Sequence, residues 1–142
     1  MNHLRTIILS AFYFITPFCC QAQSFDKKDP IDKSYEECLQ KDTSAINLSN
    51  CAYEAYSQWD RELNKSYNKL VKELVIPKDK AAFLQSQKAW LAYRDAEFHL
   101  YDNMLNKPGE KWTFERANDR VNLVKHRVLQ LRGYYQILSS KN

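Results

Sequence analysis

Apolar residues recur at three- and four-residue steps along most of the chain, which is the period of one face of an α-helix. The longest run of this pattern extends from about residue 48 to residue 74, and two others extend from about 78 to 105 and from about 113 to 139. A shorter helix is expected over about 32 to 41. The apolar positions of the longest run are Leu48, Cys51, Ala52, Ala55, Tyr56, Trp59, Leu63, Tyr67, Leu70, Val71 and Leu74. The pattern predicts an all-α protein.

Breaks between these runs predict how the helices are connected. Pro77 separates the second and third helices, and proline is tolerated in the first turn of a helix because an amide there has no partner. Residues 106–109 form the strongest turn signal after the leader, and Asn47 or Ser49 is expected to cap the second helix. The chain has only two glycines and no alternating strand pattern. We therefore expect a small helical bundle built on a long antiparallel helical hairpin.

Polar and aromatic residues interrupt the apolar faces of the two hairpin helices. They are Asp60, Leu63, Asn64 and Tyr67 on the first helix, and Gln87, Trp90, Tyr93, Arg94 and Asp95 on the second. A reversal at Pro77 would pair Asp60 with Arg94, Asn64 with Trp90, and Tyr67 with Gln87. We interpret these pairs as a hydrogen-bonded network that sets the register of the hairpin, because an unpaired buried partner is costly.

The network predicts a large effect of one substitution. If Asp60 is buried, Arg94→Ala should destabilise the fold by roughly 3 to 5 kcal/mol. The alternative interpretation places Asp60 and Arg94 in a ligand or catalytic pocket, with Asp95 and Glu97 as further acidic groups. Adjacent positions on a helix point in different directions, so these carboxylates are not expected to converge.

The first 22 residues have the pattern of a secretory signal peptide, with Arg5 followed by a short apolar stretch and small residues that end at Ala22. The apolar stretch is too short to span a bilayer, which needs roughly 20 residues. Residues 23–30 are expected to be a flexible leader, and 31–142 the folded domain. The alternative is a lipid anchor on Cys19 or Cys20. We expect a bacterial periplasmic or secreted protein with no membrane span after cleavage.

The charge of the chain argues against a nucleic-acid partner. Lys and Arg number 21 and Asp and Glu 17. Removal of residues 1–22 deletes only Arg5 among them, which leaves 20 against 17, a net charge of +3. Both signs are interleaved along the chain, whereas a nucleic-acid-binding face concentrates basic residues.

Two cysteines, Cys38 and Cys51, remain after cleavage. In an oxidising compartment they are expected to form one disulfide, which would stabilise the fold by about 3 kcal/mol through the loop that it closes. Two free thiols, or half of a metal site, are the alternatives. His99 and His126 lie on different predicted helices without a carboxylate pattern, so we expect no metal or cofactor.

Signatures of catalysis are absent from the sequence. There is no glycine-flanked serine, no glycine-rich phosphate loop and, once the cysteines are bridged, no cysteine–histidine couple. The chain is therefore expected not to be an enzyme.

Taken together, these residues resemble the LprI-like lysozyme inhibitor domain of bacterial envelope proteins, from about Tyr35 to Leu131. The marks are the two cysteines, the two hairpin motifs, and Arg127 and Leu131 in the last helix. The resemblance implies a periplasmic or surface helical domain. It also implies a second cysteine pair, which this chain lacks: Phe98 occupies one position, and the other falls near Asn118.

The resemblance suggests a protein that binds another protein, with a lysozyme as the first candidate. A segment that blocks a lysozyme cleft has to project from the fold, and the candidates are 43–50 and 106–111. The alternative is a structural or stress-related envelope protein, or one that neutralises another toxin, with no lysozyme target. Because lysozymes are usually cationic, a net charge of +3 would give no long-range attraction to one.

Overall fold

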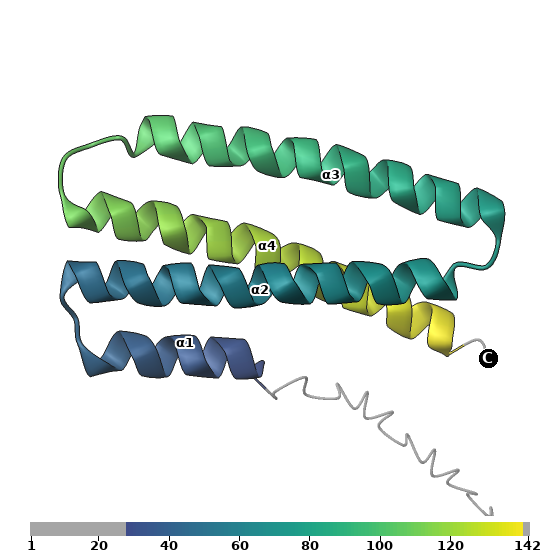
Figure 1. Cartoon of the computed structure of the whole chain (residues 1–142), viewed down its shortest axis with the longest axis horizontal. Helices are drawn as coiled ribbons and strands as arrows, with labels where there is room; N and C mark the ends of the chain where they lie inside the picture. The colour runs from purple at the N-terminus through teal and green to yellow at the C-terminus, as the bar shows by residue number, and fades with distance from the viewer. Residues whose placement is uncertain (1–27, 141–142) are drawn as a thin grey trace, which may run out of the picture.

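The computed structural model describes residues 28–140 as four consecutive helices. They are α1 (Pro30–Lys41), α2 (Ala45–Glu73), α3 (Pro77–Met104) and α4 (Glu110–Ser139). α2 and α3 run antiparallel, and α4 returns in the direction of α2 (Figure 1). The predicted all-α bundle on a long helical hairpin is confirmed. The predicted signal peptide and most of the predicted leader lie outside the described residues.

The first two helices begin earlier than the sequence predicted, because other residues cap them. Asp29 accepts a hydrogen bond from the amide of Ile31, so α1 already begins at Pro30. Ser44 accepts a bond from the amide of Asn47 at 3.4 Å and caps α2. The expectation of a cap at Asn47 or Ser49 was wrong, since both positions lie inside the helix.

Three buried alanines lie among larger residues in the seam between α2 and α4, which is the most closely packed pair of helices among the described residues. Ala52, Ala55 and Ala117 are at most 2% exposed. The other buried residues of the seam are Trp59, Leu63, Leu70, Val121, Val124, Val128 and Leu131. The distance between helix axes depends on the side chains at the contact, so alanines allow these two helices to approach closely.

α3 lies to one side of this pair and contributes little to the core (Figure 1). Only Phe83 and Gln87 of its 28 residues are buried. Large side chains carry its contacts: Phe83 lies 5.7 Å from Tyr67 between ring centroids, and Phe98 lies 6.0 Å from Tyr56. Long side chains at the interface hold the backbone of α3 away from α2 and leave open space between them.

α1 has no fully buried residue; Ile31 and Tyr35 pack against the core, and covalent and polar contacts add to its attachment. The predicted disulfide Cys38–Cys51 is present and ties α1 to α2, with 5.8 Å between the Cα atoms. Arg132 of α4 forms ion pairs with Asp29 at 2.6 Å and with Glu62 of α2 at 3.0 Å. These bonds hold α1 against the seam without a hydrophobic core of its own.

No helix within residues 28–140 is long and apolar enough to cross a membrane.

Candidate functional site

The two sequence motifs lie along an open groove between α2 and α3, with a volume of about 490 Å³. Its walls are formed by Asp60, Leu63, Asn64 and Tyr67 of α2, and by Leu84, Gln87, Lys88, Leu91 and Arg94 of α3. Six of the nine motif residues therefore line one cavity. Its volume is within the range of small-ligand pockets. The motifs do not form the closed hairpin interface that the sequence suggested.

The predicted ion pair between Asp60 and Arg94 is absent. Instead, Nε and Nη2 of Arg94 donate to Oδ1 of its neighbour Asp95, at 2.9 and 2.7 Å. Within residues 28–140, no cation forms an ion pair with the carboxylate of Asp60. The reason is the separation of α2 and α3: Arg94 reaches an acceptor on its own helix more easily than one on the opposite wall.

The other two predicted pairs were also wrong. The amide of Asn64 donates to the backbone oxygen of Asp60 at 3.1 Å, and Asn64 is exposed, where a buried position was expected. Tyr67 packs on Phe83 rather than bonding to Gln87. Asn64 thus forms a hydrogen bond within its own helix, and Tyr67 makes an apolar contact.

Trp90 lies at the α3–α4 interface between two guanidinium groups. The Arg94 guanidinium carbon is 5.7 Å from the Trp90 ring, and that of Arg127 is 5.6 Å from it. Tyr93 is 51% exposed. Neither Trp90 nor Tyr93 lines the groove, and neither does Asp95.

Arg127 of α4 holds the side chain of Gln87 in the groove wall, although the sequence suggested only that Arg127 marks the family. Its side chain is 6% exposed, and its Nε and Nη2 donate to Oε1 of Gln87 at 3.1 and 2.9 Å. No carboxylate among the described residues forms an ion pair with it. Burial lowers the pKa of Arg127, and a nearby Tyr134 opposes that shift. A charged arginine on the same helical face as the apolar Val124, Val128 and Leu131 was the available signal.

This bond orients the amide of Gln87. Since Oε1 accepts both bonds from the guanidinium, the amide nitrogen of Gln87 is turned away from Arg127. The groove therefore combines amide groups of Gln87 and Asn64 with the charges of Lys88, Arg94 and Asp60. It can bind polar or charged groups. Its lining contains one carboxylate, so it does not hold a pair of acidic groups for general acid and base catalysis.

The described residues contain no group of three or more His, Cys, Asp or Glu side chains that could hold a metal ion.

Of the two segments that were expected to project from the fold, only one is a loop in the structure. Residues 45–50 belong to α2, so the segment 43–50 is not a loop. The connection between α3 and α4 is short and exposed, and ends at Gly109 with φ of 117°, a conformation that favours glycine. A third candidate was missed: Val75, in the turn between α2 and α3, is 83% exposed.

Comparison with known protein families gives a match to the lysozyme inhibitor LprI family over residues 37–131. The chain belongs to this family. The match covers the disulfide, both motifs and Arg127. Comparison with curated proteins gives no match.

Among solved structures, the chain is similar to an uncharacterised protein from Burkholderia thailandensis, with 30% sequence identity and a TM-score of 0.72. The match covers 80% of this chain and 57% of that protein. This chain thus spans little more than half the length of the protein it resembles.

The two positions where the resemblance implied a further cysteine pair are used in other ways. Phe98 packs against Tyr56 and lies 4.9 Å below the Arg120 guanidinium. Asn118 accepts a hydrogen bond from the hydroxyl of Tyr35 at 3.1 Å. Near these positions, Arg120 joins α4 to α3 through Asp102 at 2.8 Å. The ion pair holds this end of α3 to α4, and the aromatic packing of Phe98 on Tyr56 holds it to α2.

Proposed function

We propose that this protein is exported to the periplasm or cell surface, where it binds a lysozyme and inhibits it. The observation that carries the proposal is membership of the LprI family over residues 37–131. Export rests on the signal-peptide pattern of residues 1–22. Inhibition acts by protein–protein binding, without chemistry performed by this chain.

The geometry of the groove supports a non-enzymatic role. The carboxylate of Asp60 is the only acidic group in the lining, and Asp95 is engaged by Arg94. Catalysis by paired carboxylates requires two acidic groups with different pKa values directed at one substrate. The lining of the groove therefore suits the binding of a ligand better than catalysis by paired carboxylates.

An assay of muramidase activity tests the proposal. Purified protein at micromolar excess is expected to reduce the hydrolysis of bacterial cell walls by at least one lysozyme in a panel of different types. A variant with both Cys38→Ser and Cys51→Ser provides a structural control, since it loses the tether of α1. Full muramidase activity throughout the panel would eliminate the lysozyme target.

The net charge of +3 favours a second candidate, an envelope protein whose target is not a lysozyme. Electrostatic steering accelerates association only between opposite charges, and lysozymes are usually cationic. Association with a lysozyme is therefore expected to be slow at low salt and to become faster as salt screens the repulsion. A partner recovered from envelope extract by the wild-type protein, with no lysozyme present, would support the second candidate.

A further inference from the structure

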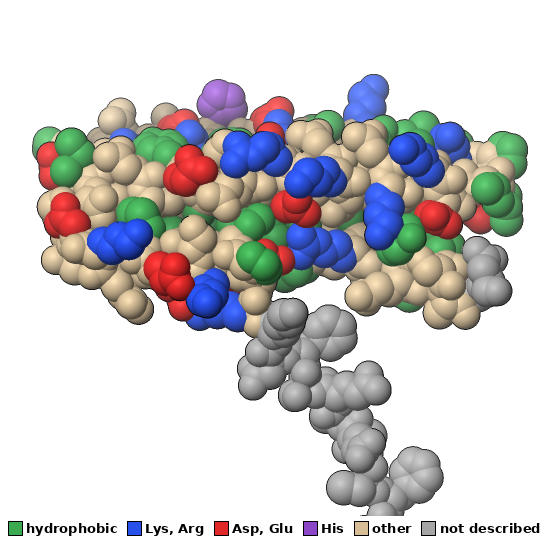
Figure 2. Space-filling model, turned by 60° about the horizontal axis from the view of Figure 1, so that its bottom comes forward, with side chains coloured by type: hydrophobic (Ala, Val, Ile, Leu, Met, Phe, Trp, Pro, Cys, Tyr) green, Lys and Arg blue, Asp and Glu red, His purple; other side chains and the backbone are tan. Residues whose placement is uncertain are grey.

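The turn between α2 and α3 exposes aliphatic side chains at one end of the molecule. Val75 is 83% exposed and Ile76 56% exposed, and Ile137 near the end of α4 is 58% exposed. Figure 2 shows hydrophobic side chains at the right-hand end of the molecule, where this turn lies. On the rest of that face, basic and acidic side chains are interspersed with further hydrophobic ones (Figure 2). Contiguous exposed apolar surface is unusual in a soluble domain and typical of an interaction site.

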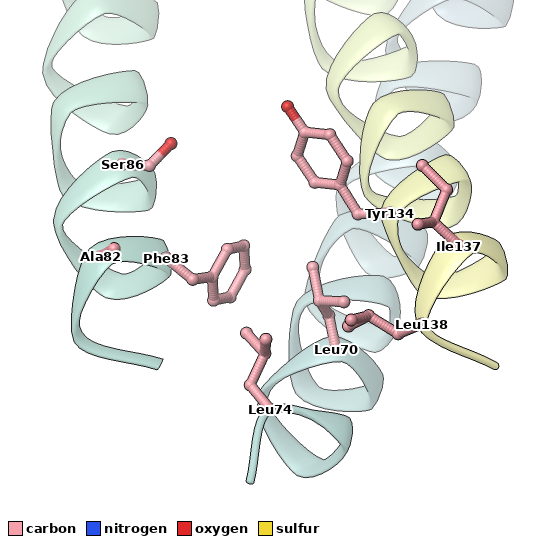
Figure 3. Close-up of a pocket in the computed structure, with 8 residues that line it drawn as sticks. All are labelled: Leu70, Leu74, Ala82, Phe83, Ser86, Tyr134, Ile137 and Leu138. Atoms are coloured by element: carbon pink, nitrogen blue, oxygen red, sulfur yellow. The ribbon is translucent and has the colours of Figure 1, made fainter. Parts of the chain in front are cut away.

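An apolar pocket of about 360 Å³ adjoins this turn. Figure 3 shows Phe83 of α3 directed towards Leu70 and Leu74 of α2, with Leu138 of α4 beside them. Leu74 and Leu138 also line a second depression, which contains Val75 and Ile76. This second depression is also lined by the charged residues Lys72, Glu73 and Asp79, so the exposed turn adjoins the apolar pocket through Leu74 and Leu138.

Backbone hydrogen bonds and a proline restrict the turn. The amide of Leu74 donates to Leu70 at 3.1 Å, and the amide of Val75 donates to Glu73 at 2.9 Å. On the other side, the amide of Lys80 donates to Ile76 at 3.0 Å, and Pro77 has a restricted φ. A turn that is already ordered loses little conformational entropy when it binds.

The charges around the turn favour a partner that carries carboxylates. Lys72, Lys78 and Lys80 flank it, against Glu73 and Asp79. Within residues 28–140, none of these three lysines forms an ion pair.

We infer that the α2–α3 turn is the segment that enters the substrate cleft of the lysozyme, an inference that rests on the proposed function. The active site of such an enzyme has two carboxylates that flank the scissile bond, one of them in a hydrophobic pocket. Val75 and Ile76 supply a narrow apolar tip for that pocket. Lys72 and Lys78, each within three residues of this tip in the sequence, supply positive charge for those carboxylates.

The opposite end of α3 supplies a matched control. Met104, the last residue of α3, is 59% exposed, close to the 56% of Ile76. The adjoining turn is polar, and the ammonium of Lys107 lies 4.7 Å from the ring of Trp112. Substitution of Met104 therefore places the same new charge at the same exposure, far from the apolar turn.

The experiment compares Ile76→Asp with Met104→Asp in the inhibition of a lysozyme that the wild-type protein inhibits. Ile76→Asp is expected to raise the inhibition constant at least tenfold, and Met104→Asp less than twofold. Chitotriose, which occupies the substrate cleft, is expected to weaken inhibition by the wild-type protein. Far-UV circular dichroism of both variants establishes that they are folded.

The outcomes separate the inference from the proposed function. Inhibition that survives Ile76→Asp, or that chitotriose does not affect, overturns the inference and leaves lysozyme inhibition in place. A wild-type protein that inhibits no lysozyme overturns both. Sedimentation of the wild-type protein with phosphatidylglycerol vesicles, lost in Ile76→Asp, would assign the turn to a membrane surface and overturn the inference.

Discussion

The two long interfaces of this bundle differ in that only one of them contains buried alanines. The α2–α4 seam has alanines at Ala52, Ala55 and Ala117, all nearly inaccessible to solvent. The face that α3 presents carries Phe83, Gln87 and larger groups. Alanines bring helix backbones together, whereas aromatic and guanidinium groups keep them apart. In this protein, the second kind of interface creates both the groove and the apolar pocket.

Buried polar groups are also distributed differently between the interfaces of the bundle. In the seam, the buried residues are almost all apolar, whereas the contact between α3 and α4 contains the buried pair Gln87 and Arg127. A buried charge without a carboxylate partner is costly unless it is fully hydrogen-bonded. α3 is thus positioned by a few specific bonds, while α2 and α4 are stabilised mainly by burial of apolar surface.

Two tryptophan substitutions test this difference, and their expected effect on stability is the largest. Trp59 is fully buried in the seam, whereas Trp90 is half-buried on α3. Trp59→Ala is expected to lower the free energy of unfolding by about 3 to 5 kcal/mol. Trp90→Ala is expected to lower it by about 1 to 2 kcal/mol, because less of its surface is removed from water. Urea denaturation measures both, and equal losses would show that α3 belongs to the core as fully as α2.

The next test removes the acceptor of the buried guanidinium. Gln87→Leu leaves Arg127 without two of its hydrogen bonds and is expected to cost about 1 to 3 kcal/mol. Arg127→Met also removes the buried charge, so the double variant is expected to be more stable than Gln87→Leu alone. A double-mutant cycle in urea measures the coupling. Additive effects would mean that the two side chains do not act as a pair.

A smaller effect is expected at Arg94, in contrast to the value predicted from the sequence. Arg94 pairs with Asp95, whose side chain is 59% exposed. Exposed ion pairs contribute little, so Arg94→Ala is expected to cost less than about 1 kcal/mol. If thermal unfolding shows that Arg94→Ala loses roughly 3 kcal/mol of stability or more, the result would support an ion pair between Arg94 and Asp60.

The smallest expected effect concerns two acidic residues of α4, Asp119 and Glu115. Burial raises the pKa of Asp119, and the carboxylate of Glu115 adds to the shift. A carboxyl group whose pKa is raised by folding favours the folded state below its unfolded pKa, and this contribution is lost as pH rises through the folded value. Asp119→Asn is therefore expected to be slightly stabilising at pH 7, by less than about 0.5 kcal/mol.

The difference between Asp119→Asn and the wild type is expected to disappear near pH 3, where the carboxyl group is protonated in both states. Thermal unfolding at the two pH values measures it. A destabilised variant at pH 7 would show that the ionised carboxylate contributes a favourable contact.

The sequence by itself determined the helices, since a 3.6-residue period and helix-breaking residues are local features. It also determined the disulfide, because only Cys38 and Cys51 remain once the predicted signal peptide is removed. Family membership followed from the spacing of the motifs, which does not depend on how their side chains are paired.

The tertiary structure alone decided which partners the motif residues take. Arg94 had two possible carboxylates, Asp60 across the hairpin and Asp95 beside it, and the distance between α2 and α3 selected the nearer one. That distance depends on the bulk of side chains from three helices, including Arg127 of α4. Pairing across a hairpin can be read from residue spacing only when the helices are in close contact, and here the large side chains of α3 prevent that contact.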